Sequence, residues 1–154
     1  MIMQKILFIS FFILLSSKLY AEMIKPNPSF SPKDVILIQL KALQTNNIPF
    51  EDAGIEQTWE FAHPNNRIYT GPLNNFTQMI KNPSYSMMID HIEHKIIPVE
   101  EQETSSYYFV ELIDSKGMKY GFEWTVEKVY EQGKFKDCWM TVGVSRPMLL
   151  SQAS

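Results

Sequence analysis

The first half of the chain carries apolar stripes at helical spacing, separated by proline-containing breaks. In the first stripe Val35, Ile38 and Leu43 recur at intervals that place them on one helix face. Ser31 followed by Pro32 is typical of a helix start, because serine caps free N–H groups and proline suits the first helical position. The pattern predicts helices over about residues 32–45, 51–62 and 72–81, with a loop around 63–71 after Pro64 stops the second helix.

From Met87 onward, β-branched and aromatic runs separated by turn signals predict strands over about 90–101, 104–113, 119–130 and 134–145. The connections around Gly117 and Gly133 are short, which makes consecutive strands antiparallel. In the third strand, apolar residues such as Phe122 alternate with polar ones such as Glu123, so one face is covered and one solvated. We therefore predict an α+β fold, with N-terminal helices packed on a curved, four-stranded antiparallel meander.

The N-terminal 21 residues read as a secretory signal peptide. Lys5 precedes an apolar run from Ile6 to Leu15, and Ala21 ends a small-residue cleavage site. The run is shorter than the about 20 residues that a membrane-spanning helix needs. We expect cleavage after Ala21 and a periplasmic or secreted protein without a stable membrane span. An uncleaved membrane anchor and an intracellular protein with a buried N-terminal helix are the alternatives.

After the signal peptide we expect an extended leader over 22–30, a single α+β domain over 31–146 and a C-terminal tail over 147–154. The formal net charge is −3, and loss of Lys5 and Lys18 with the signal peptide makes it −5. A mildly acidic chain without a basic cluster disfavours nucleic acid as a partner. Cys138 is the single cysteine, so an intramolecular disulfide is impossible, and we expect a half-buried strand residue.

Residues 61–73 form the most distinctive segment, with His, Asn, Arg and Tyr between two prolines. Together with 31–44, 76–80 and the late stretch 132–144, this segment resembles an uncharacterised family known as domain of unknown function 4864. The resemblance covers residues 28–145 and implies a fold similar to nuclear transport factor 2 and ketosteroid isomerase, in which helices close a cone of curved sheet. It implies no catalytic residues, and the family often has Ser where this chain has His63.

Four residues of this segment are candidate ligand contacts: His63, Asn66, Arg67 and Tyr69. The guanidinium of Arg67 offers five donors in a rigid fork, suited to a carboxylate or phosphate at the mouth of a cone. The alternative for Arg67, which we favour, is an internal ion pair or a cap on helix carbonyls that ties the loop down. For Asn66, a turn-forming role is the alternative to ligand binding.

The dense group around His91 and His94 raises the question of a metal site. On a strand, residues three positions apart point to opposite faces, so these two histidines would not bind the same metal ion. If a helix continued to His94, they would share a face and could coordinate zinc. No spaced Cys/His signature accompanies them, and we predict neither a metal nor a cofactor. A solvated, histidine-rich edge is the expectation.

The strands supply the remaining candidates, Tyr107, Glu111 and Trp124. Glu111 shares a strand face with Tyr107, and burial inside a cone would raise the pKa of its carboxyl group. Trp124 lies in an aromatic stripe that is either plain core or a ligand wall. The sequence contains no paired catalytic carboxylates, nucleophile elbow, phosphate loop or redox pair.

Three functions remain open. The first is a non-catalytic module that binds a small apolar or amphipathic ligand or a protein. The second is an isomerase- or hydrolase-type enzyme that uses an acidic residue or His63 in the cone. The third is an interaction protein that forms a homodimer through its sheet. We rank the binding module first because no catalytic constellation is present.

Overall fold

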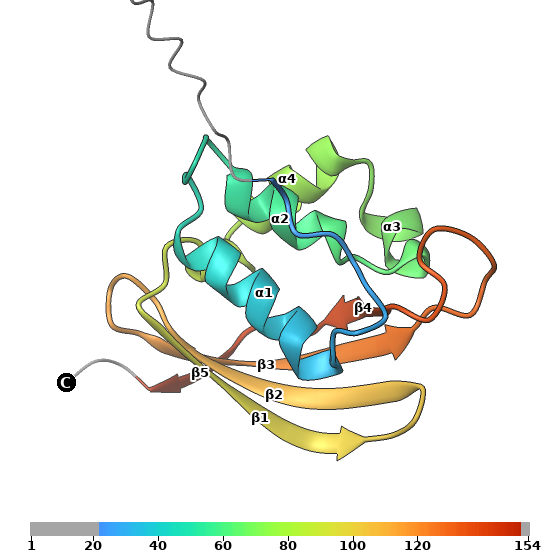
Figure 1. Ribbon diagram of the computed structural model, residues 1–154. Helices are drawn as coiled ribbons and strands as arrows, with labels where there is room; N and C mark the ends of the chain where they lie inside the picture. The colour runs from blue at the N-terminus through green and yellow to red at the C-terminus, as the bar shows by residue number, and fades with distance from the viewer. Residues whose placement is uncertain (1–21, 152–154) are drawn as a thin grey trace, which may run out of the picture.

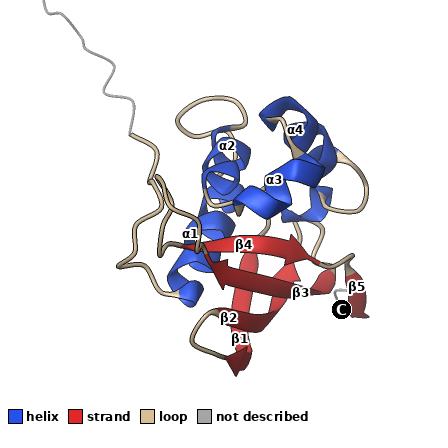
Figure 2. Cartoon of the chain, turned by 90° about the vertical axis from the view of Figure 1, so that its right-hand side faces the viewer, coloured by secondary structure: helices blue, strands red, loops and turns tan. Residues whose placement is uncertain are grey.

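A computed structural model describes residues 22–151, in which helices lie over one face of an antiparallel sheet (Figures 1 and 2). The elements are α1 (Pro32–Gln44), α2 (Ala53–Glu60), α3 (Pro64–Thr70), α4 (Leu73–Lys81), the short 3-10 helix η1 (Ser86–Met88), β1 (Glu93–Glu101), β2 (Ser105–Ile113), β3 (Lys119–Lys128), β4 (Trp139–Val144) and β5 (Met148–Ser151). The predicted signal peptide lies outside the described residues. In the part that is described, no helix is long and apolar enough to cross a membrane.

Helix α1 begins where its sequence predicts. The Ser31 hydroxyl accepts a hydrogen bond from the Asp34 N–H at 3.1 Å, and the Asp34 carboxylate accepts one from the Ser31 N–H at 2.8 Å. This reciprocal capping satisfies two N–H groups that the helix itself cannot pair. The buried face of α1 consists of Val35, Ile36, Gln39, Leu40 and Leu43. Gln39 is therefore a polar residue in an otherwise apolar stripe.

The sheet has the order β1-β2-β3-β4, and every pairing is antiparallel. Strand β3 pairs with β4 along its second half and with β5 along its first half. The predicted alternation holds on β3, because Phe122, Trp124 and Val126 are buried against the helices while Glu123 is exposed. The inward side chains of β2 and β3 and the apolar face of α1 together form the core.

The α+β class, the helices that precede the sheet and the four predicted strands are confirmed. The sheet is curved and unclosed, and its likeness to the nuclear transport factor 2 cone stays a prediction. Two local predictions are wrong. Residues 64–70 form helix α3, because Pro64 occupies the first turn of a new helix, where its missing N–H is harmless. The predicted tail contains strand β5, which lies beside β3.

The fourth predicted strand begins later than expected. Residues 129–138 form a loop rather than a tight hairpin, and Val129 exchanges backbone hydrogen bonds with Asp137 and Cys138 across it. The loop folds Cys138, Val129 and Met140 into a small second apolar cluster. Cys138 is buried, and burial raises the pKa of its thiol, so this cysteine is an inert packing residue.

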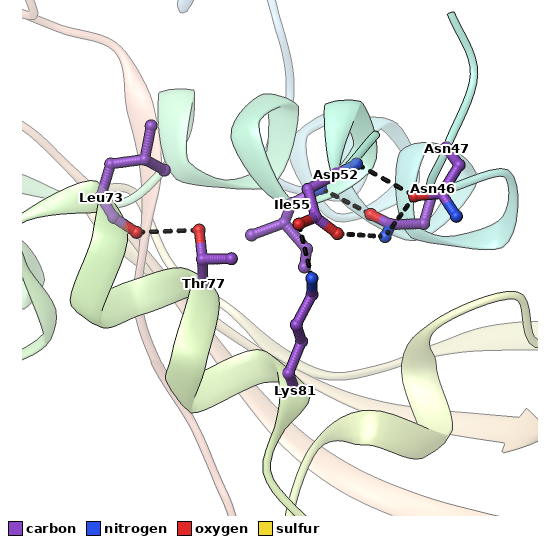
Figure 3. A network of polar contacts seen from close by, with 7 residues as sticks. All are labelled: Asn46, Asn47, Asp52, Ile55, Leu73, Thr77 and Lys81. Atoms are coloured by element: carbon purple, nitrogen blue, oxygen red, sulfur yellow. Dashed lines mark hydrogen bonds and ion pairs between the residues drawn. The ribbon is translucent and has the colours of Figure 1, made fainter. Parts of the chain in front are cut away.

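A network of side chains, which we call the helical joint, ties the end of α1 to α2 and α4 (Figure 3). The Asn46 amide donates to Asp52 at 3.0 Å and accepts from the Ile55 N–H at 3.0 Å. Lys81 of α4 reaches the other Asp52 carboxylate oxygen at 2.6 Å. The joint is Asn46, Asn47, Asp52 and Lys81, and it fixes how the helices sit over the sheet.

Candidate functional site

The space between the helices and the inner face of β3 and β4 is incompletely filled and forms a pocket of about 140 Å³, the helix–sheet pocket. Its floor is made of buried residues: Gln39, Leu43, Thr58, Ala62, Phe76, Ile80, Met88, Trp124 and Thr141. Its rim is made of half-buried residues: Asn66, Thr70, Met79, Tyr85, Gly143 and Val144. The pocket is thus mainly apolar and opens toward α3 and α4.

Four residues form a polar hub at the pocket floor: Gln39 of α1, Thr58 of α2, Trp124 of β3 and Thr141 of β4. The Trp124 indole N–H donates to the Thr141 hydroxyl at 3.1 Å. The Thr141 hydroxyl donates in turn to the Gln39 amide oxygen at 2.7 Å. The Gln39 amide nitrogen donates to the Thr58 carbonyl at 3.1 Å. Buried polar groups paired in this way rigidify a core and specify its geometry.

The rim carries further neutral polar groups. The Asn66 side chain donates to the Thr141 carbonyl at 3.3 Å, and the Tyr85 hydroxyl donates to the Val144 carbonyl at 3.2 Å. Thr70, one turn after Asn66, lines the same rim, and its hydroxyl donates a hydrogen bond to the Asn66 carbonyl at 3.0 Å. Helix α3 therefore borders the pocket with two uncharged side chains, and each is held in place by a hydrogen bond to a backbone carbonyl.

Of the residues that the sequence proposes, the structure brings Asn66 and Trp124 to the pocket. Trp124 is almost fully buried in the core and also lines the pocket, so its role as a ligand wall stays a prediction. The other five proposed residues lie elsewhere in the structure.

Arg67 is a structural clamp, as the favoured alternative holds. Its guanidinium donates to the carbonyl oxygens of Ala62, Trp59 and Glu60 at 2.9, 2.9 and 3.1 Å. These carbonyls end helix α2, where positive charge is favoured and acceptors lack helical partners. The guanidinium also lies over the rings of Trp59 and Phe135. Three of its five N–H groups, those on Nε and Nη2, are engaged with backbone oxygens, which holds the guanidinium against the end of α2.

His63 is a helix cap. Its ring nitrogen Nδ1 accepts a hydrogen bond from the Asn65 N–H at 3.1 Å, and its backbone N–H donates to the Thr141 carbonyl at 2.8 Å. A ring nitrogen that accepts is unprotonated. Burial lowers the pKa of His63, against the opposing charge of Glu127. The side chain therefore caps α3 as a neutral imidazole, which corrects its proposed role as a ligand contact.

Tyr69, Tyr107 and Glu111 face away from the pocket. Tyr69 lies on the outer side of α3 and is 87% exposed. Tyr107 and Glu111 occupy the solvated face of β2, and the Glu111 carboxylate forms an ion pair with Lys119 at 3.1 Å. The inward positions on β2 belong to the alternate residues, among them Tyr108. The proposal of an interior carboxylate at Glu111 is therefore wrong, because the pleat turns that residue outward.

His91 and His94 also depart from expectation. His91 precedes β1 and is buried, and its Nε2 lies 2.7 Å from Nδ1 of His94. The Met88 carbonyl, at 2.6 Å, accepts from Nδ1 of His91, so Nε2 of His91 accepts from His94. Burial lowers the pKa of both rings. Within residues 22–151, no group of three or more His, Cys, Asp or Glu side chains is arranged to hold a metal.

Sequence reasoning missed Gln39, Thr58 and Thr141. A signal for Gln39 was present: it follows Val35 by four residues and precedes Leu43 by four, on the buried stripe of α1. A buried polar residue is more informative than an exposed apolar one. For Thr58 and Thr141 no such signal exists, because threonine is common on half-buried helices and strands.

The fold and the pocket define an α+β protein whose helices cover one face of an open antiparallel sheet and enclose a neutral cavity. No family model, curated protein or solved structure matches the chain. The resemblance to the domain of unknown function 4864 family therefore stays a prediction.

Proposed function

We propose that the protein is a binding module for a small apolar ligand, held in the helix–sheet pocket. The pocket itself carries the proposal. Its volume, about 140 Å³, is close to that of the apolar cavities of about 150 Å³ that take up benzene. Its floor is buried and its rim is half-buried, so a ligand can enter from one side and lose most of its contact with water.

The chemistry of the lining favours binding over catalysis. Acid–base catalysis needs a group that gains and loses a proton near neutral pH and lies within reach of the substrate. Among the described residues that line the pocket, Tyr85 is the one with an ionisable side chain, and the rest are apolar or neutral. The enzyme hypothesis needs an acidic residue or His63 in the cavity, and the side chains of His63 and Glu111 are not among the residues that line the pocket.

The binding proposal is tested with toluene as the probe and isothermal titration calorimetry as the measurement. Val144 lines the rim and pairs with Trp124, so Val144→Phe places a ring in the pocket. We expect wild-type protein to bind toluene and Val144→Phe to lose at least tenfold in affinity. The matched control is Val99→Phe, which makes the same change on an exposed position of β1, 69% accessible. No toluene binding by wild-type protein, or equal binding by Val144→Phe, contradicts the proposal.

A second candidate function is dimerisation through the sheet. Val99 and Tyr107 are exposed large side chains, and both line a groove on the outer face of β1, β2 and β3 with the half-buried Phe109. Apolar side chains gathered on a solvated sheet face are typical of interaction surfaces. Native mass spectrometry tests this candidate: we expect a dimer mass that Tyr107→Lys converts to a monomer. A monomer mass for the wild-type chain contradicts it.

A further inference from the structure

The polar hub has a fixed direction of hydrogen bonding. The Trp124 indole nitrogen can only donate, so the Thr141 hydroxyl accepts from it and sends its own proton to Gln39. The Thr58 carbonyl can only accept, so the atom of Gln39 that faces it is the amide nitrogen. Rotating the amide by half a turn would place two oxygens 3.1 Å apart. The orientation of the Gln39 amide is therefore determined by its partners.

In this orientation one of the two amide protons of Gln39 has no acceptor among the described residues. The nitrogen carries two protons, and the Thr58 carbonyl takes one of them. In residues 22–151, no acceptor is found for the second proton, although Gln39 is 2% exposed and lines the pocket floor. A chain of hydrogen bonds polarises its members, so the remaining N–H of Gln39 is a strengthened donor. The pocket thus holds an unmatched donor at the end of an apolar cavity.

The lining also lacks any charge. No Asp, Glu, Lys, Arg or His belongs to the described residues that form the pocket. An ionised carboxylate or ammonium group carried into such a site would lose its hydration without gaining a partner, which is strongly unfavourable. The pocket therefore selects against charged forms of a ligand. A hydrocarbon would fit the apolar walls but would leave the Gln39 donor unpaired.

We propose that the ligand is an uncharged molecule with an apolar body about the size of one ring and a carbonyl-type oxygen that accepts the free N–H of Gln39. This inference rests on the proposed function, because it names the chemical class that the same pocket binds. A site built around a donor favours molecules that supply an acceptor, since a molecule without one leaves a buried polar group unsatisfied. The hub therefore decides specificity, while the apolar walls supply most of the affinity.

Three probes of nearly equal shape test the inference on wild-type protein: ethylbenzene, acetophenone and benzoate. On the same phenyl ring they carry an ethyl group, an acetyl group or a carboxylate group. We expect acetophenone to bind at least as tightly as ethylbenzene, and benzoate to bind weaker by on the order of a hundredfold. The carbonyl stretch of bound acetophenone should lie at lower wavenumber than in an alkane solvent, which reports the hydrogen bond directly.

The outcomes separate the inference from the proposed function. If ethylbenzene binds and acetophenone binds more than tenfold weaker, the binding function stands and the inferred ligand class is wrong. Equal binding of benzoate and acetophenone also overturns the ligand class. If none of the three probes binds, the proposed function fails together with the inference.

A pair of variants assigns the donor. Gln39→Met keeps the length of the side chain and removes the N–H, so acetophenone should lose about tenfold in affinity relative to ethylbenzene. Asn66→Ala removes the other amide of the lining, at the rim, and should leave that ratio unchanged. A changed ratio in Asn66→Ala with an unchanged one in Gln39→Met overturns the assignment to Gln39. Should Gln39→Met fail to fold, the wild-type probe series and Asn66→Ala still decide the question.

Discussion

Two buried side-chain amides, those of Asn46 and Gln39, lie in different settings. In the helical joint, the Asn46 amide uses both of its protons, one toward Asp52 and a longer one toward Asn47, and its oxygen accepts the Ile55 N–H. In the polar hub, the Gln39 amide oxygen is paired and one of its two protons is spent on a backbone carbonyl. The joint lies between helices with a lysine at its outer edge, while the hub faces a cavity.

The comparison distinguishes an amide that stabilises the fold from an amide that is available to bind a ligand. An amide whose bonds are complete is a structural fastener, and its removal strands every partner at once. An amide with one donor left over beside a cavity is able to meet a ligand without breaking any protein bond. A buried polar residue alone indicates neither role, and the count of its unused hydrogen bonds is what distinguishes them.

The largest effect is expected at the joint. Asn46→Ala leaves the Ile55 N–H and an Asp52 oxygen without partners, so we expect the free energy of unfolding to fall by about 3 kcal/mol. Urea denaturation measures the change. Asn47→Ala is the control, because Asn47 is exposed and its removal should lower the free energy by about 1 kcal/mol or less. If both variants lowered the free energy of unfolding equally, Asn46 would contribute no more to the joint than Asn47 does.

Arg67 extends the comparison to a charged fastener. Arg67→Ala removes three hydrogen bonds to the carbonyls that end α2, and we expect a loss of about 2 kcal/mol in the free energy of unfolding. Arg67→Lys keeps the charge without the planar fork and should restore less than half of the loss. Unchanged thermal stability of Arg67→Ala would rule out the clamp and return Arg67 to the list of ligand anchors.

Gln39→Met tests the hub in the same assay. The change removes the acceptor of the Thr141 hydroxyl proton and one of the two donors to the Thr58 carbonyl, which still accepts the Phe61 N–H. It keeps the apolar volume, so we expect a loss of about 1–2 kcal/mol. Toluene affinity should stay within about threefold of wild type, because walls rather than the hub hold a hydrocarbon. If Gln39→Met lowered the free energy of unfolding more than Asn46→Ala, the hub rather than the joint would be the main stabilising amide site.

Acid should weaken the fold through its histidines. Burial lowers the pKa of His63 in the folded protein below the ordinary histidine value of 6.5. The unfolded chain therefore binds protons more readily, so this part of the stability is present above about pH 6.5 and is lost as the pH falls below it. His63→Ser keeps an N-cap acceptor and should flatten the fall in unfolding free energy between pH 7 and 5. An unchanged slope would place the acid sensitivity in His91 and His94, whose pKa values burial also lowers.

The smallest effect is expected on the outer face of the sheet. Glu111→Gln breaks the ion pair with Lys119, whose side chain is 37% exposed. Because water screens such a pair, the free energy of unfolding should change by about 0.5 kcal/mol or less. A loss above about 1 kcal/mol in urea denaturation would mean that this face is more enclosed than the isolated chain shows.

Periodicity predicts much of the fold because side-chain spacing follows backbone geometry. The stripe of Val35 and Leu43 predicts the first helix to within a residue, and the alternation around Phe122 identifies which face of β3 is buried. The segment after Pro64 is misjudged because a proline that is interpreted as a helix stop is here the first residue of a new helix, while α2 already ends at Glu60. Strand β5 is missed because its apolar residues are exposed and too few to form a period.

The candidate site follows a different rule. The sequence places Asn66 and Trp124 among the residues of interest, and both line the pocket. It also nominates Arg67 and His63, whose side chains form hydrogen bonds with backbone atoms outside the pocket. Chemical character can be read from a residue type, but the partner that consumes each hydrogen bond belongs to another segment of the chain.

By itself the sequence determines the α+β class, the order of three helices and four strands, and the buried faces of α1 and β3, because these depend on local spacing and propensity. Only the tertiary structure decides that Gln39, Thr58, Trp124 and Thr141 meet, since they come from four elements as far as 102 residues apart. It also decides that packing around them stops short of filling the space. A cavity and an unpaired N–H group arise where several segments pack without filling a space or supplying an acceptor. No single segment of the sequence encodes them.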